Sequence, residues 1–505
     1  ELIREGLAHA SRSLEAIANL LQGRNPQQLR YQMQVAALTI IQAGQYRVST
    51  DAIGKRLERE PTSDIFPPAL PAFFFRSQPK GKWGEDMGIP QFSDRGNASL
   101  YASSSSPPQV RLEFSHSSLG EYLGAEEIAK QLTTLTQKVQ NQYGEVTFFI
   151  QDAVNVAQHI YGLLGYGILS PELEALVIER LRREQKRNAD VFSFAVLWQR
   201  LYRFYRAYCR GQWLDEGIAH QAHSQLQLLQ NPSNVLQVDA AVGLNVFLLL
   251  ARGAREAQIP FWPCGNPDIP QEFDPDQLLS FIGRTAALSP TVFWQRARGS
   301  LSQLHLAEAC LNQVMLAEAN LEYADLSTAE LVGINLAGAN LRHTNLSWAS
   351  LVGANFSNAN LLEANLEGAD LTGANLKGAN LKSANLAHAC LFQAQLDEQS
   401  QNVANHSGAI FSPDEFHSYK QSLTPTKIIG KFDDEELLED ETPIFIESAE
   451  GELILPDVQY GDEGEEDEYE GETVQLENSM HESRDFSDDE YGDAETAIAN
   501  PRDYA

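Results

Sequence analysis

Hydrophobic positions recur every five residues along one long stretch of this chain. Every fifth position from Leu301 to Leu396 gives 20 sites, and 19 of them hold leucine, the exception being Phe356. Alanine stands two residues before the site 15 times, and asparagine or aspartate stands one residue before it 12 times. A period of five fits neither an α-helix, which repeats every 3.6 residues, nor a strand, which alternates every two. It predicts a coil with four sides of five residues each, in which leucine and alanine point inward.

The other positions of the unit are consistent with such a coil. Glycine recurs late in the unit, as at Gly333, Gly353 and Gly373, where the chain must bend. The asparagine or aspartate lies at an outward position, where short polar side chains favour tight turns. Four units per coil make about five coils, which stack to a height of about 24 Å at the spacing of neighbouring strands. The same phase continues weakly to Phe411, so a degraded sixth coil is expected to cap the stack.

The phase also places two cysteines. Cys310 and Cys390 occupy the same outward position four coils apart, about 19 Å from each other, so no disulfide should join them. Taken together, these residues resemble the pentapeptide-repeat family closely. The resemblance implies a right-handed quadrilateral β-helix over residues 299–411.

The first 125 residues suggest a different module. A helical apolar stripe runs from Leu29 to Ile41, and a Pro- and Ser-rich stretch between Asp64 and Pro108 predicts a short β-ribbon with a flexible insertion. A capping box formed by Ser118 and Glu121 is expected to start the next helix. Residues 1–125 are therefore interpreted as a winged-helix-like region with a Ser/Pro-rich insertion.

A motif at the end of this region carries a second resemblance. Residues Phe114 to Leu123 read Phe-x-His-x-Ser-x-x-Glu-Tyr-Leu, which resembles the end of the winged helix that follows the NTPase domain in NACHT/STAND signalling ATPases. In that family the histidine can contact the phosphates of bound ADP, and His116 matches its position. The alternative is that His116 bonds nearby backbone at a helix entry. No Gly-x-x-x-x-Gly-Lys-Ser/Thr loop occurs here, so no cofactor is expected in this chain, and an NTPase binding ATP or ADP would lie upstream of Glu1.

Residues 126–298 are expected to be helical up to about Thr291, as an α-helical array. Ser170 and Pro171 predict a capped helix start, and the Pro-rich stretch from Ile259 to Pro270 predicts a break. No apolar run reaches the length of a membrane span, because the longest one, from Val242 to Ala251, is short and interrupted. It is interpreted as a buried helix.

One helix of this array carries a basic stripe. Arginines recur every three or four residues at Arg200, Arg203, Arg206 and Arg210, and residues 178–210 have a net charge of +6 with aromatic residues between the arginines. The pattern favours a solvated face above a buried aromatic stripe. Docking of the acidic tail and binding of nucleic acid are the alternatives.

The charge of the chain is concentrated in its last residues. From Asp433 onward there are 28 acidic residues and only two basic ones, Arg484 and Arg502. This part therefore carries a net charge of −26 out of the total of −32. Few hydrophobic residues accompany them, and such a segment cannot bury enough surface to offset its ordering entropy. Residues 412–505 are expected to form a mostly disordered acidic tail that acts as a spacer or docks within the chain.

The fold class is therefore α+β and multidomain: a winged-helix-like region, an α-helical array, a β-helix and an acidic tail. No catalytic constellation and no metal-ligand spacing is present, so neither an enzyme nor a metal site is expected. The four scattered cysteines suit the cytoplasm. The leading hypothesis is a non-catalytic sensor, adaptor or scaffold with protein partners, which forms the C-terminal part of a NACHT-type NTPase. The alternatives are a DNA-mimicking inhibitor, although the net charge of −7 over residues 301–400 is modest for that role, and a purely structural scaffold.

Overall fold

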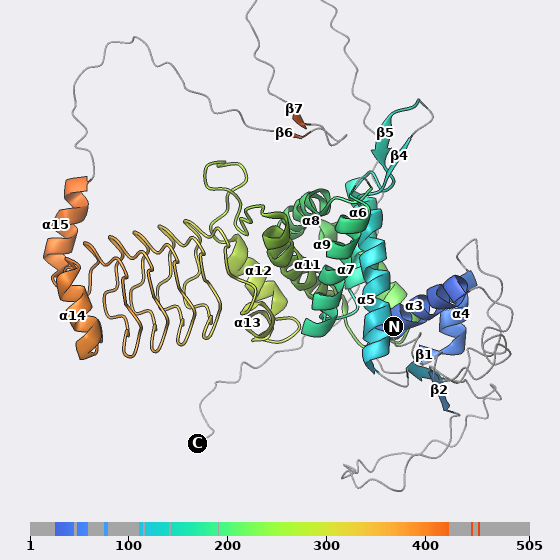
Figure 1. Ribbon diagram of the computed structural model, residues 1–505, viewed down its shortest axis with the longest axis horizontal. Helices are drawn as coiled ribbons and strands as arrows, with labels where there is room; N and C mark the ends of the chain where they lie inside the picture. Colours follow the sequence, from blue (N-terminus) through green and yellow to red (C-terminus); the bar gives the residue numbers. More distant parts are fainter. Residues whose placement is uncertain are drawn as a thin grey trace, which may run out of the picture. The chain divides into compact units, whose positions relative to one another are not determined.

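The computed structural model describes residues 26–44, 48–58, 75–78, 111–114, 117–140, 143–189, 191–423, 446–447 and 453–454 (Figure 1). The chain divides into two compact units, residues 1–436 and 437–505. In the second unit, β6 (Ile446–Glu447) pairs antiparallel with β7 (Leu453–Ile454). The predicted disorder of the acidic tail falls almost entirely outside the described residues and stays a prediction.

The N-terminal part combines two helices with a small sheet. The helices are α3 (Pro26–Gln42) and α4 (Thr50–Glu58), and the strands are β1 (Val48–Ser49), β2 (Phe75–Gln78) and β3 (Arg111–Phe114). All pairings are antiparallel, and the strand order is β1-β3-β2. The predicted stripe on α3 is buried at Met33, Ala36 and Ala37. Of the ribbon predicted between Asp64 and Pro108, the described residues contain one strand, β2, which pairs with β3 beyond that stretch.

The next helix, α5 (Ser117–Thr134), packs closely against α3. It begins one residue before the predicted cap, Ser118, which therefore lies in its first turn. A Cβ atom at Gly124 would lie 2.2 Å from Cδ1 of Ile41, so glycine is what permits this close approach of the two helices.

The expected helical array is present from α6 to α13. Its helices are α6 (Ala153–Leu164), α7 (Pro171–Arg187), α8 (Phe194–Cys209), α9 (Gln212–Asp215), α10 (Ile218–Leu228), α11 (Val235–Ala257), α12 (Gln277–Thr285) and α13 (Val292–Ala297). Ser170 caps α7 as predicted, because its side chain accepts a hydrogen bond from the Leu173 N–H at 3.1 Å. The expectation of helix throughout was wrong in one place. A β-hairpin of β4 (Lys138–Gln140) and β5 (Val146–Phe148) lies between α5 and α6 and turns at Gly144, whose φ is +83°.

Helix α11 is the central helix of the array. By length and composition alone it could cross a membrane, but 78% of its apolar window is buried inside the fold. Its one fully buried amide, Asn245, bonds the Leu169 N–H and the carbonyls of Leu164 and Gly167 at 2.8–2.9 Å. The polar residue that interrupts the apolar run therefore holds the loop between α6 and α7.

Residues 301–396 form the predicted coil with a period of 20 residues. The Leu341 N–H donates to the Asn360 carbonyl of the next coil at 2.8 Å, and parallel bridges join residues 20 apart along the stack. Leu321, Leu341 and Leu361 are 0% exposed, and so is Phe356. The predicted inward positions of leucine, and of phenylalanine in its place, are therefore confirmed.

Each corner of the coil is a tight turn, as between Phe356 and Ala359, where the Ala359 N–H donates to the Phe356 carbonyl at 2.9 Å. The residue before the alanine has a positive φ, and glycine occupies six of these sites, as predicted. The asparagines have a role that the sequence did not indicate. Asn340 Nδ2 donates to Oδ1 of Asn320 one coil away at 2.9 Å, and similar bonds continue along the columns. These side chains tie neighbouring coils together.

Two helices follow the last coil, α14 (Glu398–His406) and α15 (Pro413–Leu423), so the expected sixth coil and the start of the tail at residue 412 were wrong (Figure 1). The leucine phase would fall on Gln401 and His406, which cannot fill an apolar shaft. Asp397 instead caps α14 by accepting from the Ser400 N–H at 2.8 Å. Only Ile410 keeps the coil register, paired with Cys390.

Two glycines at equivalent corners should respond differently to substitution by alanine. Gly353 has open space around its missing Cβ, whereas a Cβ at Gly368 would lie 2.6 Å from the Trp348 ring. Both have positive φ, so each Gly→Ala change should cost about 1–2 kcal/mol in backbone strain. We expect Gly368→Ala to cost about 1–3 kcal/mol more, because the Trp348 ring must move. Urea denaturation of the two variants would measure this difference, and equal losses would contradict it.

Candidate functional site

One outward column of the coil combines partly exposed apolar side chains with glycine at the corners. In this column, the residue after the inward leucine and the corner residue that follows it recur every 20 residues. The first rung is polar, with Asn312 and Gln313. We call the next four rungs the valine face, which comprises Val332, Val352, Thr372 and Phe392 with Gly333, Gly353 and Gly373. Val332 is 38% exposed, and the three glycines are exposed. At the other corners, residues such as Tyr323 and Glu363 accept the strained conformation and project a side chain. Glycine avoids the strain and leaves the valine column accessible.

The C-terminal helices cover the neighbouring end of the coil. Phe416 of α15 packs on Cys390 and Ile410, so Cys390 is buried although it points outward from the coil. The Tyr419 ring stacks on the His388 ring, with 4.2 Å between the ring centroids, and on the Trp348 ring, with 6.1 Å between the centroids. Trp348, at an outward position of the repeat, is therefore half-buried beside Tyr419 of α15. Phe411, 38% exposed, extends the apolar surface at the C-terminal end of the coil.

The acidic side chains on the other faces of the coil are partly paired. Glu322 lies 3.8 Å from Arg342, and Glu363 lies 3.3 Å from Nδ1 of His343. Glu318 pairs with Arg298 at 2.9 Å. These contacts break up the negative surface rather than concentrating it.

The four predicted arginines do not share one role. Arg200 stacks on the Phe148 ring at 4.2 Å and donates to the Ile150 carbonyl, and Arg206 bonds Gln277 Oε1 at 2.7 Å and the Glu272 carbonyl. Arg203 and Arg210 are exposed. Burial and the charge of Arg203 lower the pKa of Arg200. Two of the four cations thus hold the β4–β5 hairpin and the loop before α12, and a role of the four in interactions stays a prediction.

The aromatic stripe beneath these arginines is buried, as predicted. Trp198, Tyr205 and Tyr208 are at most 6% exposed and belong to the main core. These side chains cannot stack on nucleic-acid bases unless α8 unfolds. Base stacking on them is therefore excluded as a way in which this helix could bind nucleic acid. His116 lies outside the described residues, and its contact with a nucleotide stays a prediction.

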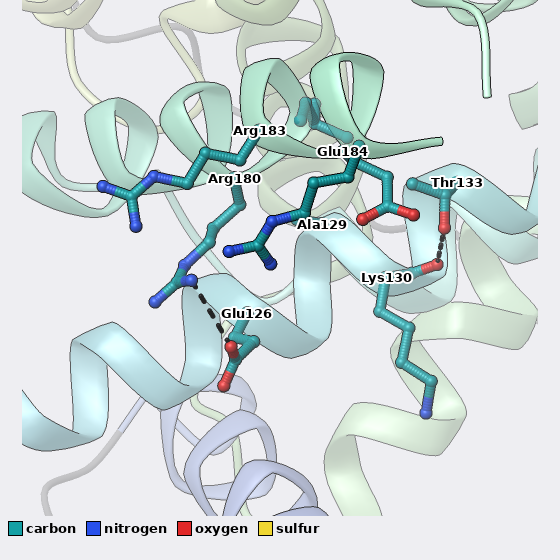
Figure 2. Close-up of a pocket in the computed structure, with 9 residues that line it drawn as sticks. Glu126, Ala129, Lys130, Thr133, Arg180, Arg183 and Glu184 are labelled. Atoms are coloured by element: carbon teal, nitrogen blue, oxygen red, sulfur yellow. Dashed lines mark hydrogen bonds and ion pairs between the residues drawn. The ribbon is translucent and has the colours of Figure 1, made fainter. Parts of the chain in front are cut away.

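A basic groove between α5 and α7 was missed at the sequence level. It encloses a cavity of about 180 Å³ lined by Glu126, Ala129, Lys130, Thr133, Arg180, Leu181, Arg183, Glu184 and Arg187. Figure 2 shows Arg180 reaching from α7 toward Glu126 of α5, with Arg183 and Lys130 on opposite sides. The spacing of Arg180, Arg183 and Arg187 at i, i+3 and i+7 is visible in the sequence. The apposition of α5, which brings Lys130, is not.

Buried charges hold the helical array together at two further places. Asp239, 3% exposed, accepts from the hydroxyls of Tyr161 and Tyr208 at 2.6 and 3.2 Å and pairs with Arg284 at 3.0 Å. Burial, and then the charge of Asp239, raise the pKa of both tyrosines, which therefore remain hydrogen-bond donors. These contacts are structural rather than catalytic, because the carboxylate is enclosed and fully bonded.

Buried Glu174 is the second such charge. It lies between Arg252 at 2.8 Å and Arg296 at 2.9 Å, and so links α7 to α11 and α13. Across the described ranges, no group of three or more His, Cys, Asp and Glu residues could hold a metal ion.

The four cysteines should differ in reactivity. All are free, as predicted for Cys310 and Cys390. Burial raises the pKa of Cys209 and Cys264 to about 12, so at pH 8 only about one thiol in 10⁴ is ionised, and Cys390 is buried. We expect a thiol reagent at pH 8 to label only half-exposed Cys310 rapidly in the folded chain and all four after denaturation. Comparable rates at two or more sites would contradict this.

Comparison with known proteins identifies the coil. Residues 329–361 and residues 359–396 each match the family described as pentapeptide repeats (8 copies). This segment is therefore made of pentapeptide repeats, whose fold is a right-handed β-helix. No curated protein matches the chain.

Solved structures similar to this chain include three pentapeptide-repeat proteins. One from the Arabidopsis thaliana thylakoid lumen is 24% identical over 22% of this chain and 79% of its own, with a TM-score of 0.16. HetL of Nostoc sp. strain PCC 7120, involved in heterocyst differentiation regulation, is 35% identical over 20% of this chain, with a TM-score of 0.15. Rfr23 of Cyanothece 51142 is 31% identical over 22% of this chain, with a TM-score of 0.12. This chain spans 50% of HetL and 66% of Rfr23.

Proposed function

With residues 301–396 taken as pentapeptide repeats, we propose that the chain is a non-catalytic protein-interaction scaffold whose β-helix binds a protein partner through the valine face. The observation that carries this proposal is the column of Val332, Val352, Thr372 and Phe392 beside three exposed glycines. Val332 is exposed and the other three side chains are half-buried. A column of partly exposed, mostly apolar side chains is typical of surfaces that a partner covers. The four side chains lie on successive coils, so the surface is about 14 Å high from Val332 to Phe392, at the spacing of neighbouring strands.

Rigidity supports the role of a platform. The coil is joined to the helical array by backbone bonds rather than by a linker: the N–H groups of His305, Cys310 and Asn320 donate to the carbonyls of Phe261, Pro275 and Arg298 at 2.7–2.9 Å. Trp294 Nε1 also donates to the Ala317 carbonyl at 2.6 Å. A partner bound to the coil would therefore act on the helical array without the entropy loss of ordering a hinge.

The finer proposal is that these residues are the C-terminal part of a NACHT-type signalling NTPase. It is supported by the order α3, β1, α4, β2, β3 and by the sheet order β1-β3-β2, which agree with a winged helix preceding a helical array. On this proposal the β-helix is the sensor or adaptor end. ATP or ADP would bind to a preceding NTPase domain, with His116 as a phosphate contact, and the protein would act in the cytoplasm.

A DNA-mimicking inhibitor is less well supported. Such a mimic needs continuous unpaired negative charge, whereas Glu318, Glu322 and Glu363 of this coil lie beside cations or a histidine. A supercoiling assay with a gyrase-type enzyme discriminates between the two functions. We expect no inhibition at concentrations at which the protein partner binds.

The test of the scaffold compares two outward substitutions at the same position of the repeat. Val352→Arg places a charge on the valine face, and Ser357→Arg places the same charge on the next side of the coil. The intact chain and both variants are used to capture proteins from cells that express the chain, and captured proteins are quantified by mass spectrometry. We expect one partner to be retained by the intact chain and by Ser357→Arg but reduced at least tenfold by Val352→Arg. Equal retention by both variants would overturn the valine face as the binding surface.

A further inference from the structure

We propose that the groove between α5 and α7 is a binding site for an extended acidic peptide of a protein partner. Its cations are Arg180, Arg183 and Arg187 of α7 and Lys130 of α5. This site is separate from the valine face and does not depend on the function proposed for it.

The acidic groups already present neutralise the groove only in part. Arg183 pairs with Glu179 at 2.7 Å, and Lys130 lies 3.8 Å from Glu127. Glu126 is held by Arg30 through bonds of 2.6–3.0 Å and by Gln34 at 2.7 Å, while Arg180 approaches it only to 3.5 Å. Burial alone would raise the pKa of Glu126, but the bonds from Arg30 and Gln34 hold it below its ordinary value. Glu184 accepts from Asn188 at 2.6 Å. The shortest bonds of Glu126 and Glu184 are therefore made to residues other than the groove cations.

Arg180 has an unused donor at this place. Its side chain is 14% exposed and stacks on the Tyr122 ring at 4.3 Å, which fixes the guanidinium. Its Nη2 is buried and has no hydrogen-bond partner. A buried donor without a partner is unfavourable by about 1–3 kcal/mol. A carboxylate entering the groove would pair with the accessible part of the Arg180 guanidinium, which lines the cavity and whose orientation is already set.

The spacing of the cations favours an extended chain over a single anion. Arg180 and Arg187 are seven residues apart on α7, about 10.5 Å along the helix axis. One phosphate cannot reach both ends, whereas carboxylates on alternate residues of an extended peptide are about 6.8 Å apart. The cavity of about 180 Å³ admits carboxylate side chains but is smaller than typical pockets for a ligand of nucleotide size. Exposed Arg187 and Lys130, whose side chain is 57% exposed, are accessible to a chain lying across the groove.

The experiment measures binding of a fluorescent decapeptide of alternating glutamate and serine to the full chain by anisotropy. The double variant Arg183→Glu/Arg187→Glu reverses two exposed groove charges and leaves the packed Arg180 in place. The control, Lys377→Glu/Lys382→Glu, makes the same charge change at two exposed residues of the β-helix. We expect saturable binding that weakens at least tenfold in the groove variant and at most about threefold in the control. Thermal unfolding of both variants, with midpoints near that of the intact chain, shows that they fold.

Several outcomes would overturn the proposal. Equal weakening by the groove variant and the control would mean non-specific attraction to positive charge. Displacement of the peptide by equimolar inorganic phosphate would mean a site for a single anion rather than for an extended peptide. Absence of saturable binding to the full chain would exclude the groove as an acidic-peptide site.

Discussion

Replacing Leu341 with alanine is expected to lower the free energy of unfolding of the β-helix by about 3–5 kcal/mol, the range found for fully buried leucines. Leu341 is 0% exposed and stands between Leu321 and Leu361 in one column of the shaft. The nearest inward residue of its own unit is Ala339, which is too small to fill the cavity that the substitution leaves. Urea denaturation followed by circular dichroism would measure the loss.

The control for this variant is Leu362→Ala, which removes the same atoms from the outward residue next to Leu361. Leu362 is only half-buried, so we expect a loss below about 1 kcal/mol. Similar losses in Leu341→Ala and Leu362→Ala would mean that the shaft can collapse around a missing side chain. The argument from close packing of the coil would then be wrong.

Arg284→Met is expected to destabilise the helical array by about 3–5 kcal/mol, because it leaves the buried carboxylate of Asp239 without its cation. The tyrosine hydroxyls that bond Asp239 are neutral and cannot replace the lost charge. The Arg284 guanidinium also stacks on the Tyr208 ring at 4.2 Å and donates to the Tyr208 carbonyl at 2.7 Å. Thermal and urea denaturation of the variant would measure the loss.

A double-mutant cycle with Asp239→Asn separates the charge from the packing. If the unpaired carboxylate causes the loss, Arg284→Met should cost much less in the Asp239→Asn background than in the intact chain. Additive losses would attribute the effect to the stacking on Tyr208 instead.

The repeat could be predicted from the sequence because each inward position depends only on its place in the unit. A leucine every fifth residue determines which side chains point inward. Each inward side chain then packs against the inward side chains of neighbouring units of the same repeat. The asparagine bonds, such as that between Asn340 and Asn320, could not be predicted with the same certainty, because they join residues one coil apart. They become evident only when the number of units per coil is known.

The interpretation of the arginines was less complete for a physical reason. Their spacing on α8 is correct, but a guanidinium is long enough to bond a segment far away in the sequence. Arg200 reaches Ile150, and Arg206 reaches Glu272 and Gln277. Neither partner has a sequence signal that identifies it. The basic groove was missed for the same reason, because Lys130 and Arg180 are brought together by the packing of α5 on α7.

The end of the repeat, predicted as a sixth coil up to Phe411, was also wrong. Ala404 and Ile410 keep the small and apolar character of the unit, and this similarity extended the predicted coil. The Asp397 cap and the loss of leucine at position 401 are local signals for a helix that outweigh it. A helix-capping residue directly after the last regular leucine is therefore a better indicator of where the repeat ends. Scattered residues that still fit the five-residue spacing are a poorer one.

The covered ends of the β-helix have a consequence for how the molecule behaves at high concentration. A stack of parallel rungs with a bare terminal rung would present unpaired amide and carbonyl groups, which can template the addition of another chain and lead to fibres. Here three sides of the first rung donate to carbonyls of the helical array, while Ile410 and the two final helices lie over part of the last one. Growth by end-to-end addition is thereby obstructed at both ends, and the lateral faces are left as the surfaces through which other molecules can be recruited.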